Sequence, residues 1–464
     1  MTSPALGSRR LGPDSDSGRD PGCDPGCDSD PQQWRGLLPT DRRFVALPSR
    51  GRPLVVAATE APVLSYVRTA LLAAQPHSAV PDWAYATARE ILRIRPLWWL
   101  MPQLALTPPG RGQPDGSGPV GGGELADGGG LAGLLAAHGT RIVVLRHSHD
   151  PDARTLLLLF GPADPWPKLA VKLPSGPAAA LRVLAEARQL RAVGALPLGA
   201  LRTTVPGVVE LVLHAGLPAL VTTAQPGTPV LVAYHRRGHT ARPATVQADL
   251  AAAQTWLANF QNATSDGTTT LDLAPGTVDT LTRLADAEPG AHPGAQPGGG
   301  TDLLPQLIAL RRRLGRYTAP RTAVHGDFWP GNVLLHRGAV SGVVDWERYE
   351  PVGSPTRDLA RFVLTYSYYL DGHTKPGHRV RGHPGLVAGD PATSVTYALD
   401  GAGWYPGLVR EYLRRGLARL GLPPECGRDA VLAEVAALAA EATDDSFRRE
   451  QLRVFHHLCT AVTP

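Results

Sequence analysis

Residues 323–347, AVHGDFWPGNVLLHRGAVSGVVDWE, decide the fold of this chain. Asp327 follows a short apolar segment, and Asn332 comes five residues later, behind a Pro-Gly turn. The apolar pair at 343–344 predicts a short buried strand that ends in Asp345. Two carboxylates and one amide therefore lie at the ends of neighbouring short strands. Such oxygens suit Mg²⁺ when the ion is bound together with substrate phosphates.

The order H-x-D-x-x-x-x-N, followed by an apolar strand and Asp, resembles the catalytic and metal loops of the aminoglycoside phosphotransferase and choline kinase-like family. This resemblance implies an α+β, protein-kinase-like fold with a small antiparallel-sheet lobe and a mostly helical large lobe. It also implies that Asp327 accepts the proton of an attacking hydroxyl, that Asn332 and Asp345 hold Mg²⁺, and that His325 braces the loop. The alternative is a surface segment in which Asp and Asn only cap turns.

The pattern upstream of this loop predicts a small lobe. Apolar segments at about residues 141–147, 155–160 and 169–173 predict three strands. An amphipathic helix is predicted over 178–193, and two further strands flank a short turn within 208–223. Three strands, one helix and two strands is the order of the small lobe in the family named above.

The use of lysine points to a nucleotide site. Of the 46 basic residues, only Lys168, Lys172 and Lys375 are lysines. A chain that uses arginine almost everywhere is expected to keep lysine where a compact ammonium is needed. Lys172 ends the third predicted strand, and the resemblance pairs it with Glu186 of the helix to position nucleotide phosphates. The alternatives are an edge-strand solubility residue and a solvated helix face.

Two further segments bear on the nucleotide. The turn between the first two strands, RHSHDPDAR, has no glycine, which argues against a protein kinase and leaves Ser148 and backbone amides as phosphate contacts. Residues 222–227 resemble the hinge whose backbone binds the purine, with Thr223 and Gln225 as contact residues. The expected cofactors are ATP and Mg²⁺, with GTP as an open alternative to ATP.

The remainder of the large lobe is predicted to be helical, over residues 246–263, 303–315, 411–420 and 430–458. The resemblance implies that Asp358 braces the catalytic loop from beneath. A carboxylate at the start of a helix is also stabilised by the helix dipole, and both roles can hold together.

Three histidines, His373, His378 and His383, recur at intervals of five residues, which match neither a helix face nor the usual zinc pairs. A loop that faces the substrate is therefore favoured over a metal site. Trp404 and Tyr405 offer flat apolar surface on which a sugar ring could stack, and core packing explains them equally well.

Composition predicts a disordered tail (1–42), a flexible linker (109–130) and a flexible insert near 286–301. The pattern of apolar residues predicts a small α/β appendage (43–108). The resemblance implies a kinase-like N-lobe (131–226) and a kinase-like C-lobe (227–464) that contains the insert. Residues 96–107, PLWWLMPQLALT, are too short to span a bilayer, and buried core is favoured over a membrane-surface segment.

The charge and the cysteine content indicate which binding partners and which cellular compartment to expect. The formal net charge is +5, but the basic residues are spread along the chain, so no nucleic-acid partner and no integral membrane segment are expected. Four cysteines form no convincing disulfide or metal framework, which fits a reducing, cytoplasmic location.

The pattern as a whole predicts an ATP-dependent phosphotransferase that acts on a hydroxyl of a small molecule. A catalytically silent nucleotide sensor or scaffold of the same fold is the alternative. Residues 371–383, expected to line the acceptor pocket, carry Lys375, Arg379, Arg381 and three histidines against the single Asp371. Aminoglycosides are polycations, so a sugar-like neutral or anionic acceptor is favoured.

Overall fold

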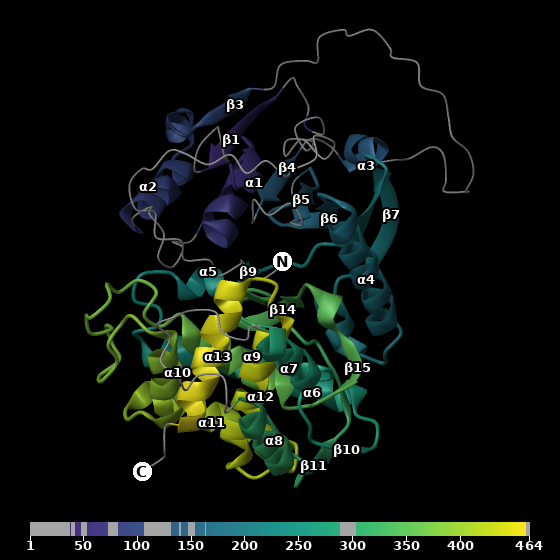
Figure 1. Cartoon of the computed structure of the whole chain (residues 1–464). Helices are drawn as coiled ribbons and strands as arrows, with labels where there is room; N and C mark the ends of the chain where they lie inside the picture. The colour runs from purple at the N-terminus through teal and green to yellow at the C-terminus, as the bar shows by residue number, and fades with distance from the viewer. Residues whose placement is uncertain are drawn as a thin grey trace.

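The computed structural model forms two lobes (Figure 1). It describes residues 38, 42–47, 53–72, 82–105, 131–138, 141–146, 154–162, 164–287 and 303–460. Most of the predicted disordered tail, the whole predicted linker, most of the predicted insert, and Ser148 lie outside these residues. An antiparallel sheet builds the upper lobe in Figure 1 and helices build most of the lower one. The predicted α+β, two-lobed, kinase-like fold is confirmed.

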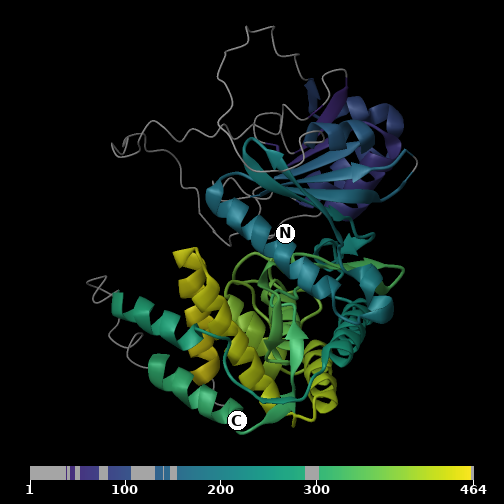
Figure 2. The ribbon, with the colours of Figure 1, turned by 90° about the vertical axis from the view of Figure 1, so that its right-hand side faces the viewer.

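The small lobe contains the five predicted strands and the predicted helix between them. They are β4 (Ile142–Arg146), β5 (Arg154–Phe160), β6 (Pro167–Pro174), α4 (Pro177–Gly194), β7 (Val208–His214) and β8 (Leu217–Thr223). A short helix α3 (Leu131–His138) precedes them, and η4 (Gly199–Thr204) follows α4. In Figure 2, α4 lies between the sheet and the large lobe.

Alternation along β6 explains how Lys172 reaches α4. Successive side chains of a strand point to opposite faces of the sheet. Val171 and Leu173 are buried in the apolar core on one face of the sheet. Lys172 therefore points to the opposite face, where α4 packs with Val183 in the core that continues into the large lobe.

The N-terminal segment extends the same sheet. Its strands β1 (Arg43–Leu47), β2 (Val55–Ala58) and β3 (Gln103–Ala105) give the antiparallel order β3-β1-β2-β4-β5-β6-β8-β7. The helical elements beside these strands are α1 (Ala61–Tyr66), η2 (Val67–Leu71), α2 (Asp82–Arg93) and η3 (Arg95–Leu100). Phe44 and Leu157 belong to one apolar core, so this segment packs as part of the small lobe.

One sequence interpretation fails within η3. Trp99 is 71% exposed and Leu100 is 50% exposed, although residues 96–107 were expected to be buried core. Met101 and Leu104 are buried as expected. The difference arises because this short helix lies at the end of the sheet and covers it with only part of its surface. Among the helices of the described residues, none combines the length and apolar character required to cross a bilayer.

The large lobe is built from helices around one apolar core. The helices are α5 (Val230–Tyr234), α6 (Pro243–Thr264), α7 (Thr277–Ala287), α8 (Leu303–Leu314), α9 (Arg357–Tyr368), α10 (Pro391–Asp400), α11 (Trp404–Arg419), α12 (Cys426–Glu441) and α13 (Asp445–Thr460). Helix α10 is not among the helices predicted from the sequence. Helix α9 is buried along most of its length, because α6, α10, α11 and α12 pack around it.

Three small antiparallel sheets carry the loops of the large lobe. Strand β10 (Thr268–Thr270) pairs with β11 (Thr318–Pro320), β12 (Thr322–Val324) pairs with β15 (Glu350–Gly353), and β13 (Val333–His336) pairs with both β14 (Ala339–Val343) and β9 (Thr228–Pro229). The loop that contains His325, Asp327 and Asn332 connects β12 to β13 and is called the catalytic-type loop below. The turn η5 (Trp346–Arg348) follows β14.

Candidate active site

The loop that contains Asp327 is held in shape by a glycine and a buried carboxylate. Gly326 has a φ of +78°, and a Cβ atom there would lie 2.1 Å from the carbonyl oxygen of Arg348, so only glycine fits. The Asp358 carboxylate, at the start of α9, accepts hydrogen bonds from the backbone N–H groups of His325 (2.8 Å) and Gly326 (2.9 Å). Burial raises the pKa of Asp358 to about 7, although both backbone donors oppose that rise.

His325 lies inside the loop and contacts no solvent. Its Nδ1 accepts a hydrogen bond from the N–H of Asp327 (3.2 Å), so its proton is on Nε2, which donates to the carbonyl of Val344 (3.1 Å). Burial lowers the pKa of His325 to about 4, and the imidazole is therefore neutral near pH 7. These contacts join the loop to the end of β14, as expected of a bracing residue.

Asn332 points toward Asp327. Its Nδ2 donates to the Asp327 backbone carbonyl (3.0 Å) and to Oδ2 of the same residue (2.9 Å). Its Oδ1 is buried and accepts no hydrogen bond from the described residues. A buried amide oxygen without a donor is costly, and a bound cation would satisfy it.

Asp345 brings the two lobes together. Its φ of +68° lies in the left-handed region, which residues other than glycine adopt rarely and mostly at functional sites. The Lys172 ammonium contacts Oδ1 of Asp345 (3.0 Å) and both carboxylate oxygens of Glu186 (2.5 and 2.6 Å). Burial would lower the pKa of Lys172, but Asp345 and Glu186 raise it above its ordinary value. The ammonium is therefore charged.

Arg154, at the start of β5, joins the same group. It forms an ion pair with Glu347 (2.8 Å) and lies 3.6 Å from a carboxylate oxygen of Glu186. Burial would lower the pKa of this guanidinium, but Asp345, Glu347 and Glu186 raise it. The sequence carried no signal for this role, because arginine is the common basic residue of the chain.

A second group of charged residues, which was also not predicted from the sequence, contacts Asp327. Arg361 of α9 donates from Nε (3.1 Å) and Nη2 (2.7 Å) to Oδ1 of Asp327. Arg361 also forms an ion pair with Glu434 of α12, and Arg357 pairs with Glu350 and Glu441. The signal available in the sequence was the position of Arg361, one helical turn after Asp358, which puts both side chains near the same loop.

The predicted hinge, residues 222–227, leads from β8 of the small lobe to β9 of the large lobe. The Thr223 hydroxyl accepts a hydrogen bond from the backbone of Gly207 (2.8 Å), and the side chain itself is exposed. Gln225 is buried against Gly342 of β14, where a Cβ atom would lie 2.4 Å from the Gln225 Cβ. The Ser341 hydroxyl donates to the carbonyl of Pro226 (2.5 Å), which ties the hinge to the strand that leads to Asp345.

A small hollow, with a volume of about 20 Å³, lies beside Asp327. Its lining comes from the catalytic-type loop and from α9, α12 and α13, and consists of Asp327, Trp329, Arg361, Leu364, Thr365, Tyr368, Tyr369, Leu438, Phe447 and Gln451. Residues 371–383, which were expected to line the acceptor pocket, do not contribute to it. They pack beside the loop after α5 instead, because His373 contacts His235 there (2.9 Å).

The three spaced histidines do not converge. His373 contacts His235, while His383 is buried among Trp404, Tyr397 and Tyr405. Within the described ranges, no group of three or more His, Cys, Asp or Glu residues could hold a metal ion. Tyr405 is buried and its hydroxyl contacts Ser367 (2.9 Å), so it belongs to the core.

The search of curated protein sequences found no match. Among solved structures, the chain is similar to the streptomycin–ATP complex of APH(2'')-IIa, with 15% identity, coverage of 68% of this chain and 90% of that chain, and a TM-score of 0.39. It is also similar to a thermostable mutant of APH(4)-Ia (12% identity, 68% and 92% coverage, TM-score 0.42) and to APH(3'')-Id from Streptomyces rimosus (14%, 66% and 89%, 0.35).

The match to a family model covers the Lys172 group and the loop that contains Asp327, but ends before Glu434 and Glu441 of the second group. The model of the phosphotransferase enzyme family, APH, matches residues 144–426. That range is more than half of the 464 residues, and it includes Lys172, Asp327 and Asp345. The chain therefore belongs to the APH phosphotransferase enzyme family.

Proposed function

We propose that the protein transfers the γ-phosphate of ATP to a hydroxyl group of a small molecule. The observation that carries this proposal is the contact of Lys172 with both Glu186 of the small lobe and Asp345 of the large lobe. It places a compact cation between the lobes, in contact with two carboxylates. Phosphoryl transfer requires such a cation for the phosphates and oxygen ligands for a metal ion.

The residues present fit a magnesium ion. Asn332 Oδ1 and the Asp345 carboxylate would hold it, and the lack of a donor for Asn332 Oδ1 among the described residues supports this assignment. Two protein oxygens suffice for Mg²⁺, because phosphate oxygens and water complete its shell. When bound, the ion neutralises phosphate charge. The protein's own contribution is to orient the phosphates through Lys172, which Glu186 holds in place.

Asp327 is the group proposed to orient the acceptor hydroxyl and to take its proton. Arg361 holds one oxygen of this carboxylate and Asn332 holds the other. The position of Asp327 is therefore set from two sides, which favours transfer because alignment supplies much of the rate in such reactions.

The side chains around the small hollow beside Asp327 favour an acceptor that is not a polycation. Asp327 is the carboxylate in its lining, Arg361 is a cation, and four aromatic residues supply apolar surface. A second carboxylate, Glu450, interacts with the hydroxyl of Tyr368. The surface therefore favours a neutral or anionic compound such as a sugar, since binding a polycation needs several converging carboxylates.

Three acidic residues near the end of the chain, Glu441, Asp444 and Asp445, do not alter this preference for a neutral or anionic acceptor. Glu441 is engaged by Arg348 and Arg357, and Asp445 pairs with Arg448. Asp444 accepts a hydrogen bond from the N–H of Phe447 (2.8 Å) at the start of α13. Carboxylates already occupied by arginines and backbone donors offer little to an amine-rich ligand.

Transfer from γ-labelled ATP to a panel of acceptors tests the proposal. Neutral sugars, amino alcohols and nucleosides form one arm, and kanamycin-type amines form the other. We expect transfer to a member of the first arm, with Asp327→Asn slower by about 10²–10⁴-fold, as for loss of a general base. Asp279→Asn, an exposed change on α7, is the matched control and should keep the wild-type rate.

Two results would contradict the proposal in different ways. Absence of Asp327-dependent transfer to every acceptor, with MgATP still bound, would favour a silent nucleotide-binding member of the family. Efficient transfer to the amines, weakening steeply as salt rises, would retain the phosphotransferase and reject the acceptor preference.

A further inference from the structure

A second hollow lies between two segments that play no part in the site above. One segment is the loop after α5, at residues 235–242, and the other is the loop at 379–385 before α10. The lining consists of Arg237, Gly238, Ala241, Arg242, Arg381 and Gly382, and its volume is about 560 Å³. It shares no residue with the lining of the hollow beside Asp327.

The two segments are fixed against each other. Gly382 has a φ of +81°, and a Cβ atom there would lie 2.7 Å from Cα of Ala241, so the backbones approach more closely than another residue allows. The indole N–H of Trp404 donates to the carbonyl of Gly382 (2.8 Å), and the neighbouring His383 is buried. The shape of the hollow is therefore set by the fold.

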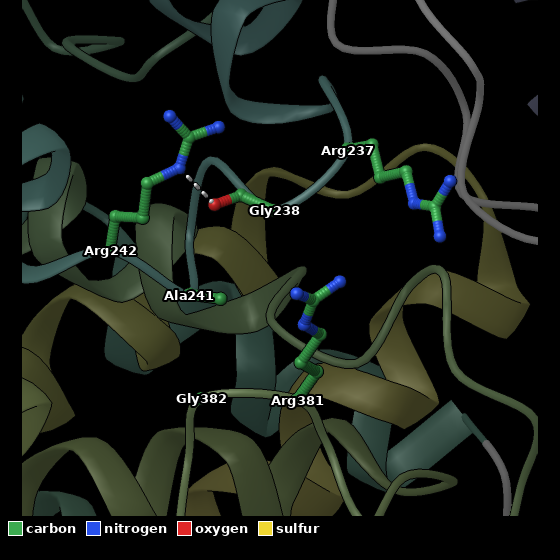
Figure 3. Close-up of a pocket in the computed structure, with 6 residues that line it drawn as sticks. All are labelled: Arg237, Gly238, Ala241, Arg242, Arg381 and Gly382. Carbon is green, nitrogen blue, oxygen red and sulfur yellow. Dashed lines mark hydrogen bonds between the residues drawn. The ribbon is translucent and has the colours of Figure 1, made fainter.

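The hollow is surrounded by arginines that form no ion pair with the acidic residues that the structure describes. Figure 3 shows Arg242 on one side of the segment that contains Gly238, with its Nε donating to the carbonyl of Gly238 (3.0 Å), and Arg237 and Arg381 on the other side. Its lining contains no carboxylate. In the described part of the chain, none of these three arginines forms an ion pair with Asp or Glu, whereas Arg311, Arg313, Arg357 and Arg361 all do.

Such an arrangement has a physical cost that an anion would remove. Like charges repel, and the repulsion is only partly screened in a concave surface. A guanidinium has a planar set of donors that matches phosphate oxygens in pairs, which is why arginine clusters favour phosphate over a simple halide ion. The alternative is a set of solvated surface arginines that bind nothing in particular.

We propose that this hollow binds the phosphate group of a phosphorylated small molecule, at a site separate from the catalytic-type loop. An adjoining hollow shares Gly382 and is lined by Arg379, Val387 and Trp404, so an apolar or flat part of the ligand has a surface beside the phosphate. The combined space exceeds what a bare phosphate ion fills and is of the size of small-molecule sites. A sugar phosphate has this chemistry.

Calorimetric titration of the full chain at low ionic strength tests the site. The probes are glucose 6-phosphate, inorganic phosphate and glucose. We expect glucose 6-phosphate to bind more tightly than inorganic phosphate and glucose to show no binding. Arg381→Gln and Arg242→Gln should each weaken sugar-phosphate binding at least tenfold, as expected for the loss of one charge-assisted contact. Arg312→Gln, an exposed arginine of α8 without an ion pair among the described residues, is the matched control.

The outcomes separate this site from the proposed active site. Lys172→Ala should leave sugar-phosphate binding unchanged, and a loss in that variant would assign the binding to the nucleotide site instead. Equal affinity of the wild type and the Arg381→Gln, Arg242→Gln double variant would overturn the proposal. It would also be overturned if the wild type bound no sugar phosphate, or if inorganic phosphate bound as tightly, which would indicate an adventitious ion only.

Discussion

Two buried groups of ion pairs lie on either side of the catalytic-type loop, and they differ in which lobes they connect. Lys172 and Glu186 of the small lobe meet Asp345 of the large lobe. On the other side, Asp327, Arg361 and Glu434 all belong to the large lobe. The first group therefore depends on how the lobes approach each other, and the second depends only on the packing of α9 against α12.

This difference separates ligand binding from stability. The exposed fraction is 3% for Arg361 and 2% for Glu434, so these charges are buried whenever the large lobe is folded. Removing one partner from such a pair leaves an uncompensated buried charge. The pairs between the lobes can exchange a protein partner for a phosphate or a metal ion without unfolding either core. We expect changes there to impair nucleotide use more than stability.

The largest effect on stability is expected for Arg361→Met, which leaves Asp327 buried without its cation and leaves Glu434 with only the more distant Arg357 (3.6 Å). The free energy of unfolding should fall by about 3–5 kcal/mol, measured by urea titration. Arg311→Met removes a guanidinium from an exposed pair with Asp272 and should change stability little. A similar loss in both variants would show that burial of the Arg361 group does not matter.

The next effect concerns the metal. Asp345→Ala should abolish the gain in ATP affinity that Mg²⁺ provides, because the remaining ligand, Asn332, is neutral and cannot offset the dehydration of the ion. Calorimetry with ATP, with and without Mg²⁺, measures this gain. Asp266→Ala, at a highly exposed carboxylate, is the control. Unchanged MgATP affinity in Asp345→Ala would contradict the metal assignment.

Lys172→Arg tests whether the group between the lobes needs a compact ammonium. A guanidinium is larger and planar, and Arg154 already lies 3.6 Å from Glu186 Oε2 and 4.0 Å from Asp345 Oδ1. We expect kcat/KM to fall by about 100-fold, nearly as far as in Lys172→Ala. Lys168→Arg changes an exposed lysine of the same strand and is the matched control. A rate near that of the wild type in Lys172→Arg would refute the prediction.

The smallest expected effect is on how stability depends on pH, and it comes from Asp358, which holds the catalytic-type loop. The pKa of Asp358 is raised from its ordinary value of 3.8 to about 7, so the folded state binds more protons than the unfolded state between these values. The corresponding stability is present below about pH 4 and is lost as the pH rises toward 7. Asp358→Asn should show a smaller loss of unfolding free energy over that range, by at most about 1.4 kcal/mol per pH unit.

Urea titrations at pH 5, 6 and 7 measure this difference, with Asp279→Asn as the control for an exposed carboxylate. His325 has the opposite sign, because its pKa is lowered to about 4 and its contribution is lost as the pH falls from about 6.5. Since His325 is present in every variant, its contribution cancels in the comparison. Parallel pH profiles for the wild type and Asp358→Asn would contradict the raised pKa.

Much of the fold was predictable because its signals are local. The strands and helix of the small lobe follow from apolar segments and turns a few residues long, and β4 to β8 with α4 appear in the predicted order. The long helices α6, α8, α11, α12 and α13 were indicated for the same reason. The pairing of β1 to β3 with this sheet was not predicted, because no pattern within a strand identifies the strand that lies beside it.

The sequence by itself determined which residue types stand at the centre of the site and in what order. His325, Asp327, Asn332 and Asp345 lie within 21 residues of one another, where spacing alone restricts the geometry. Lys172 was identifiable because lysine is rare in this chain. Each of these signals is carried by composition or by short spacing, and both are visible without a structure.

Only the tertiary structure decided the partners that come from afar. Arg361 reaches Asp327 across 34 residues, and Glu434 reaches Arg361 across 73. The hollow beside Asp327 is lined by α12 and α13 rather than by the loop at 371–383, and the arginines of the second hollow meet from two distant loops. Contacts over such separations leave no period in the sequence. Arginine is moreover so common here that no single one is conspicuous until packing sets it beside a carboxylate or leaves it without one.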